Sequence, residues 1–152
     1  MEERKIVASL MVYSYDELSE QYKLLIDKAK QVTKNAYAPY SHFAVGAAVL
    51  TKDGQVYTGC NIENASYEAT NCAERTALFK AYSMGYKKED IKALAVVADT
   101  DRPTSPCGAC RQVMSELMRQ ETPVYMANLK GDVMILSVKE LLPYSFSESD
   151  LK

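Results

Sequence analysis

The stretch IKALAVVA, at residues 91–98, constrains the fold of this chain more than any other feature of the sequence. It is a run of apolar and β-branched residues, which is typical of a buried strand. Helical and strand-like patterns precede and follow it, so we expect this strand to belong to a sheet that packs between helices. The chain has 152 residues and is long enough to bury such a core within one domain.

An amphipathic helix is predicted over residues 15–35. Apolar side chains recur there at helical spacing and form one stripe. Ser14 followed by Glu17 is typical of a capping box, and Tyr13 and Leu18 are placed for a hydrophobic staple. We therefore expect the helix to begin directly after this cap.

The elements after this helix are predicted from periodicity, turn residues and caps. In order they are strands 43–50 and 55–60 joined by a turn at Asp53-Gly54, a helix over 72–82, strand 91–98, a helix with Ser105 as its N-cap and Pro106 as its first residue, strands 123–128 and 132–137, and a helical turn at 138–143. This order predicts an α/β fold, a three-layer α-β-α sandwich with a central mixed five-stranded sheet. Residues 14–152 are expected to form a single domain, and residues 1–13 a leader without an assigned role.

Charge and hydropathy exclude several classes of partner. The net charge of −2 and the pI near 5.5 disfavour a nucleic-acid partner, since phosphate binding needs clustered Lys and Arg. No apolar run approaches the ~18 residues of a membrane span, and residues 1–13 lack the basic start of a signal peptide. We therefore expect a cytoplasmic protein, in which cysteines stay reduced.

The motif SPCGAC, at residues 105–110, contains two cysteines that are three positions apart. By itself the pair Cys107 and Cys110 fits either a redox dithiol or half of a metal site. A third cysteine, Cys72, begins another predicted helix, and the segment between the two helices is long enough for one helix, a turn and a strand. Both helix N-termini can then reach the same edge of the sheet, which would bring three thiols together.

Three thiols at two helix N-termini favour a catalytic zinc site over a structural one. Catalytic zinc has three protein ligands and one open position, whereas structural zinc has four. Three thiolates leave a net charge of −1 on the site, which the two helix dipoles and Arg75 would offset. Glu74 is the candidate proton carrier, and its pKa should rise beside a negative cluster away from bulk water. The residues alone therefore predict a zinc hydrolase with a tuned carboxylate.

In these motifs the sequence resembles a known family, the cytidine/deoxycytidylate deaminases. Within it, the resemblance is to the zinc-dependent cytidine deaminases of the small homotetrameric type. The resemblance rests on Cys72-Ala73-Glu74, on PCGACRQ at 106–112, and on the segments YAPYSHFAVGAAVL and GCNIENASY. It implies hydrolytic deamination of cytidine and 2′-deoxycytidine to uridine and 2′-deoxyuridine in pyrimidine salvage, with release of ammonia. It also implies one Zn²⁺ per subunit and a homotetramer with shared active sites.

The resemblance also implies roles for individual residues. Cys72, Cys107 and Cys110 would hold the zinc, while Glu74 takes a proton from the zinc-bound water that attacks C4 and passes protons to N3 and the leaving amine. The remaining residues would bind the nucleoside or support the thiolates: Asn61 and Glu63 at the ribose 3′-hydroxyl, Phe43 stacked on the base, Ala65 and Ala73 as backbone contacts, Phe146 supplied by a neighbouring subunit, and Arg75 bonded to the thiolates.

Other functions stay open at this stage. One is deamination of another aminopyrimidine nucleoside such as blasticidin S, and one from a different class is a thiol oxidoreductase that uses Cys107 and Cys110. Polynucleotide editing is disfavoured by the negative net charge. A non-catalytic zinc module would need Cys60 or His42 as fourth ligand, but Cys60 is better explained as a small buried residue and His42 as a loop residue. Arg111 and Gln112, which follow the cysteine pair, have either a local role or a functional one.

Overall fold

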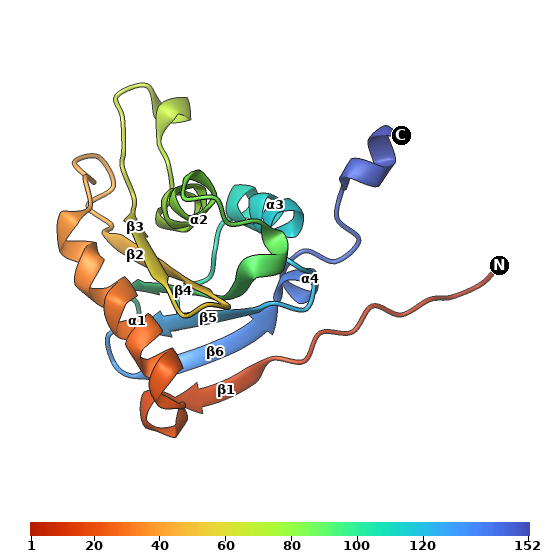
Figure 1. The fold of residues 1–152 in the computed structure, drawn as a ribbon, viewed down its shortest axis with the longest axis horizontal. Coiled ribbons are helices and arrows are strands. Elements are labelled where there is room, and N and C mark those ends of the chain that lie inside the picture. Colours follow the sequence, from red (N-terminus) through yellow and green to blue (C-terminus); the bar gives the residue numbers. More distant parts are fainter.

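The computed structural model describes residues 1–152, which fold around one six-stranded sheet (Figure 1). The strand order is β1-β6-β5-β4-β2-β3, and all neighbours are antiparallel except β4 and β5. The strands are β1 (Met11–Ser14), β2 (Val45–Thr51), β3 (Val56–Cys60), β4 (Ile91–Ala98), β5 (Pro123–Asn128) and β6 (Asp132–Ser137), and the helices are α1 (Glu20–Val32), α2 (Ala73–Ser83), α3 (Gly108–Leu117) and α4 (Val138–Leu141).

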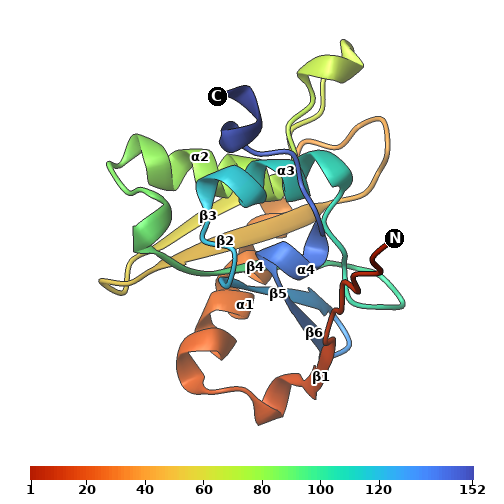
Figure 2. The same ribbon diagram turned by 90° about the vertical axis from the view of Figure 1, so that its right-hand side faces the viewer.

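Helices cover both faces of the sheet, as Figure 2 shows, with α1 on one face and α2 and α3 on the other. The buried side chains of β4 alternate between the two layers: Leu94 and Val96 pack with α2 and α3, whereas Ala95 and Val97 pack with α1. The predicted α-β-α sandwich is therefore confirmed, and IKALAVVA is buried on both sides. None of the helices is long and apolar enough to cross a membrane.

The sheet has six strands, so the predicted number of five is wrong. The additional strand is β1, which forms one edge of the sheet, pairs antiparallel with β6 and spans the predicted boundary between leader and domain. Tyr13 packs against the cluster under α1, and the Tyr15 amide donates to the Gly131 carbonyl at 2.8 Å. A four-residue strand at a sheet edge is held by its partner strand, and its own sequence carries too short a pattern to reveal it.

The first helix begins later than predicted. Ser14 and Glu17 do form the capping contact, in which the Ser14 amide donates to the Glu17 carboxylate at 2.7 Å. The element that they cap is a 3-10 turn at Tyr15–Glu17, after which Leu18 is extended and Ser19 becomes the N-cap of α1. The apolar stripe of the helix is confirmed, since Leu25, Ile26 and Ala29 are buried against the sheet.

Two glycines bring the helical layers close to the sheet. Gly46 of β2 faces α1, and a Cβ atom at this position would lie 1.9 Å from the Ala29 carbonyl oxygen. Gly59 of β3 faces α2, and a Cβ atom there would lie 2.4 Å from the Ala77 nitrogen. Any larger residue would therefore force the helix away, and Gly59 in particular sets the position of the first turns of α2.

Candidate active site

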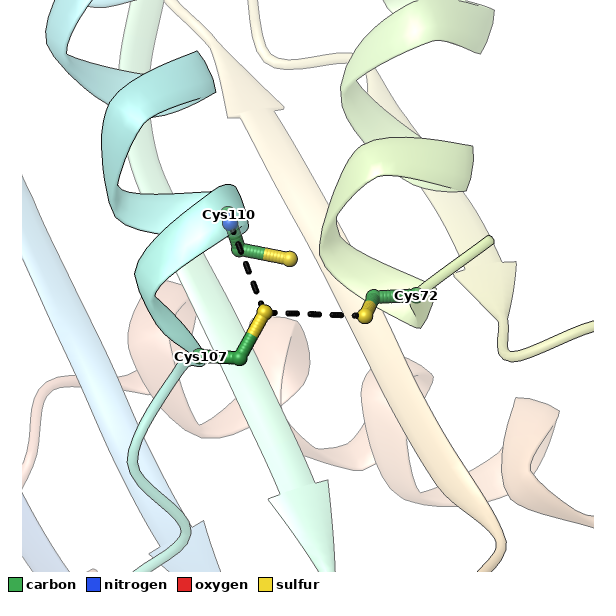
Figure 3. Close-up of side chains that lie close together, drawn as sticks. All are labelled: Cys72, Cys107 and Cys110. Carbon is green, nitrogen blue, oxygen red and sulfur yellow. Dashed lines mark hydrogen bonds between the residues drawn. The ribbon is translucent and has the colours of Figure 1, made fainter. Parts of the chain in front are cut away.

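The three predicted cysteines meet between the N-termini of α2 and α3 (Figure 3). Their sulfur atoms all lie within 4.8 Å of one another, and the Cys72 and Cys107 sulfurs are 3.7 Å apart. Cys72 is the N-cap residue of α2, and Cys107 is the N-cap residue of α3. The predicted convergence of the two helix starts is confirmed.

The cap of α3 differs from the prediction, which placed it at Ser105 with Pro106 as the first helical residue. Cys107 is the cap, because its backbone is extended and its sulfur accepts the Cys110 amide at 3.5 Å. Ser105 instead accepts a hydrogen bond from the Arg111 side chain at 2.5 Å. A thiolate can replace the usual hydroxyl as an acceptor at a helix N-terminus, where the dipole favours negative charge.

The donor set fits zinc. Three sulfur ligands from two helix starts are the soft donors that zinc accepts, and of these Cys110 is buried, Cys72 is half-buried and Cys107 is exposed. Cys60 is buried at the end of β3 and His42 is exposed in a loop, and neither belongs to the cluster. The cluster therefore has three protein ligands, as a site with an open position requires.

Arg75 supports negative charge on the sulfurs. One of its terminal nitrogens donates to the Cys72 sulfur at 3.3 Å, and its buried Nε has no hydrogen-bond partner. The pKa of Cys72 is lowered to about 5, first by its interaction with the neighbouring Cys110 side chain and next by the hydrogen bond from Arg75. Cys72 is thus held as a thiolate, the form that binds a metal, whereas its interaction with Cys72 and burial raise the pKa of the Cys110 thiol.

Glu74 lies next to the Cys110 sulfur and is only 5% exposed. The Cys110 thiol donates to its carboxylate over 3.7 Å. Burial raises the pKa of Glu74 to about 7, and the negative charge of Cys72 adds to this effect. The predicted rise is confirmed, although burial contributes more than the neighbouring sulfur does. A carboxyl group with this pKa can both accept and donate a proton near neutral pH.

A cleft of about 310 Å³ opens onto the sulfurs and Glu74. The cleft is lined by residues that are far apart in the sequence. Those predicted as site residues are Phe43, Asn61, Glu63, Cys72, Ala73, Glu74 and Cys107, and the others are Ser41, Val45, Thr70, Thr104 and Ser105. An aromatic ring, a carboxylate and an amide thus face the same cavity as the metal-ligating residues. Such a mixture of apolar and polar lining is typical of a site for a small ligand.

Asn61 and Glu63 fix the loop that carries Phe43. The Asn61 side chain accepts from the Val45 amide at 2.9 Å and donates to the Phe43 carbonyl at 2.7 Å. The Glu63 carboxylate accepts from the Ser41 amide at 3.1 Å and from the Ser41 hydroxyl. These bonds, the hydroxyl first, hold the pKa of Glu63 below its usual value, so this end of the cleft is negatively charged.

A profile of the cytidine and deoxycytidylate deaminase zinc-binding region matches residues 19–126. The chain belongs to this deaminase family. The cytidine deaminase of Halalkalibacterium halodurans is 60% identical over 129 residues, which are 85% of this chain and 96% of that protein. The cytidine deaminase of Sporosarcina psychrophila is 58% identical over 127 residues, which are 84% and 92% of the two chains.

Solved structures of the family have the same fold. The cytidine deaminase of Burkholderia pseudomallei superposes with a TM-score of 0.81 at 53% identity, and covers 82% of this chain and 98% of its own. That of Mycobacterium tuberculosis gives a TM-score of 0.69 at 39% identity, over 83% and 97% of the two chains. This deaminase-family chain therefore shares nearly the whole length of these relatives.

Two residues for which the family resemblance implied a contact with the substrate lie outside the cleft of the single chain. Ala65 is exposed in the loop between β3 and α2. Phe146 is 57% exposed in the C-terminal segment, where its carbonyl accepts from the Gln112 side chain at 3.0 Å. Neither of them lines the deaminase cleft within one chain, so their roles stay predictions.

The prediction also omitted residues that the cleft contains. Ser41 stands in the segment YAPYSHF, directly before His42 and Phe43, and this position was a signal that its hydroxyl could serve the site. Thr104 and Ser105 come from the loop between β4 and α3. Both residues stand directly before Pro106 and Cys107, so their closeness to a predicted metal ligand was the signal that could have found them.

Proposed function

We propose that this protein catalyses the hydrolytic deamination of cytidine and 2′-deoxycytidine to uridine and 2′-deoxyuridine, with release of ammonia. One observation carries the proposal: a single cleft is lined by two of the three clustered cysteines, a buried carboxyl group and a polar end beside an aromatic ring. The relatives of 58–60% identity are named cytidine deaminases, which supports the same substrate class.

Cys72, Cys107 and Cys110 would hold the zinc ion. Bound there, zinc supplies Lewis acidity that lowers the pKa of water from ~15.7 toward ~7. Glu74 would accept a proton from the attacking water and deliver protons to N3 and to the amino group at C4, so that ammonia leaves. Its pKa of about 7 lets it serve as base and then as acid in one turnover.

The other end of the cleft would orient the nucleoside. The Phe43 ring offers a flat apolar face for the pyrimidine. Asn61 and Glu63 would hydrogen-bond the ribose 3′-hydroxyl, since each retains hydrogen-bonding capacity beyond its contacts to the loop. The charge of Glu63 would repel a phosphate at this position, which favours nucleosides over nucleotides.

The active enzyme is proposed to be a homotetramer in the cytoplasm. Phe146 is 57% exposed in the single chain, which leaves its ring free to enter a neighbouring subunit's site as the family resemblance implies. Ala65 and Ala73 would contribute backbone groups around the substrate, where small side chains leave room for the ligand.

Metal analysis combined with a cytidine assay tests the proposal. We expect about one zinc per chain and a loss of the cytidine ultraviolet band, with weaker turnover of blasticidin S. Glu74→Gln should retain the zinc and lose at least ~10²-fold in kcat, the scale of a positioned acid-base group. The exposed Glu121→Gln is the matched control and should keep full activity. A zinc-loaded protein that leaves cytidine unchanged would overturn the proposed function.

A further inference from the structure

The side chain of Arg111 forms three hydrogen bonds beside the candidate metal site. Its Nε donates to the Pro106 carbonyl at 2.9 Å, one terminal nitrogen donates to the Ser105 hydroxyl at 2.5 Å, and the other donates to the Leu141 carbonyl at 2.7 Å. Two of these acceptors lie in the loop before α3, and the third lies at the end of α4. The planar guanidinium thus connects two segments that are 35 residues apart in the sequence.

The loop that Arg111 holds carries part of the site. Ser105 and Cys107 both line the cleft, and Cys107 is the exposed member of the sulfur cluster. The loop has no helical or strand bonds of its own before Cys107, and Pro106 has no amide hydrogen to donate. The backbone amide of Arg111 also donates to the Cys107 carbonyl at 3.0 Å. Arg111 therefore restrains this ligand from both main chain and side chain.

The other end of the connection is anchored in the core. Val138 and Leu141 of α4 are buried in the same cluster as α2 and α3, and a capping box of Ser137 and Glu140 fixes the start of α4. The Leu141 carbonyl is thus a fixed point rather than part of a mobile loop. A donor that reaches both Leu141 and the loop transmits this rigidity to Cys107.

We propose that Arg111 is a positioning residue that fixes the Ser105–Cys107 loop to the end of α4 and so slows the release of the metal. The inference rests on the proposed function only for the identity of the metal as zinc. Residues that orient metal ligands are worth about 10- to 100-fold in metal affinity or activity. Lysine cannot replace arginine here, because a single ammonium group cannot reach three acceptors in this planar arrangement.

The test is the rate of zinc transfer from the loaded protein to an excess of a chromophoric chelator. We expect Arg111→Lys and Arg111→Met to release zinc about 10- to 100-fold faster than the unchanged protein. Arg119→Lys is the matched control, because this arginine lies just after α3 and is exposed. Its release rate should stay within about twofold of the unchanged protein's.

A double-mutant cycle separates positioning from general destabilisation. Ser105→Ala removes one acceptor of Arg111, so its effect on zinc release should be smaller and should not add to that of Arg111→Lys. Unchanged release in Arg111→Lys, or strictly additive effects of the two substitutions, would overturn the proposal. If Arg111→Met does not fold, Arg111→Lys and Ser105→Ala still decide the question. Because zinc transfer is measured without cytidine, failure of the proposed deamination leaves this result readable.

Discussion

Gly59 lies directly against α2, so close that a Cβ atom on it would stand 2.4 Å from the backbone nitrogen of Ala77 and 2.8 Å from the carbonyl oxygen of Ala73. The same helix begins at Cys72 and carries Glu74 in its first turn. The distance between β3 and α2 therefore fixes where a metal ligand and the candidate proton carrier stand. A residue without a side chain is the condition for this placement.

Gly59→Ala should displace α2 and thereby impair the site. We expect a loss of about 1–3 kcal/mol in the free energy of unfolding from overpacking, together with faster zinc release. Gly46→Ala is the control, because its Cβ would clash with the Ala29 carbonyl oxygen of α1 on the opposite face. It should cost stability by a similar mechanism but leave the rate of zinc release unchanged. Equal zinc release from both variants would contradict the argument.

The buried carboxyl group of Glu74 should make the stability of the zinc-free protein depend on pH. Its pKa in the folded state is raised to about 7 from an ordinary value of 4.5, so folding favours the protonated form. The protein is then most stable with respect to this group below pH 4.5, and loses up to about 3 kcal/mol as the pH rises through 7. Glu74→Gln should abolish this dependence.

Urea denaturation of zinc-free protein at pH 5 and pH 8 measures the effect. The variant Glu74→Gln should gain stability relative to the unchanged protein at pH 8, and much less at pH 5. Glu121→Gln, at an exposed position, controls for the loss of one negative charge. A stability difference that is the same at both pH values would show that Glu74 does not titrate as its burial implies.

The sequence was informative about the site because its key residues lie at helix starts. Cys72 and Cys107 each begin a helix that faces the same layer of the sheet, and local patterns locate both helices to within two residues. Only one helix and the buried strand β4 separate the two cysteines in the sequence. So short a connection leaves few positions for the start of α3 relative to the start of α2. The convergence of the sulfurs could therefore be predicted without knowledge of any other contact.

Features that depend on distant side chains could not be predicted in this way. The strand β1 exists because it pairs with β6, which lies more than 100 residues later in the chain. Ser105 looks like a helix cap in the sequence, but Arg111 takes its hydroxyl and the sulfur of Cys107 caps the helix instead. In both cases a partner outside the local segment decides between two locally acceptable structures.

At pH values above its own pKa, Glu140 should hold the end of the leader (residues 1–13) to the domain. Its carboxylate accepts from the Ser9 amide at 2.6 Å, and from the Ser137 amide and hydroxyl at 2.9 and 2.7 Å. These bonds, that from Ser9 first, lower its pKa to about 2. A carboxyl group with a lowered pKa stabilises the fold above pH 4.5, and this contribution is lost as the pH falls toward 2.

Amide hydrogen exchange at Ser9 and in β1 measures this contact. Glu140→Gln should speed exchange there at pH 7 by about fivefold, the equivalent of a contact of about 1 kcal/mol. Glu148→Gln, in the exposed C-terminal turn, is the control and should leave β1 unchanged. If exchange in β1 is the same with and without Glu140, then pairing with β6 alone holds this strand.

His42 should tolerate glycine better than a β-branched residue, because its φ of 56° lies in the left-handed region. It turns the chain between Ser41, which bonds to Glu63, and Phe43, which faces the cleft.

His42→Gly should keep the stability within about 1 kcal/mol, while His42→Val should cost about 2 kcal/mol and raise the KM for cytidine severalfold. Gly54→Val adds strain of the same kind in the turn between β2 and β3, at a φ of 87° and outside the cleft lining, and should lower stability alone. Denaturation and steady-state kinetics on the three variants check this, and an unchanged KM in His42→Val would refute the role of this turn in placing Phe43.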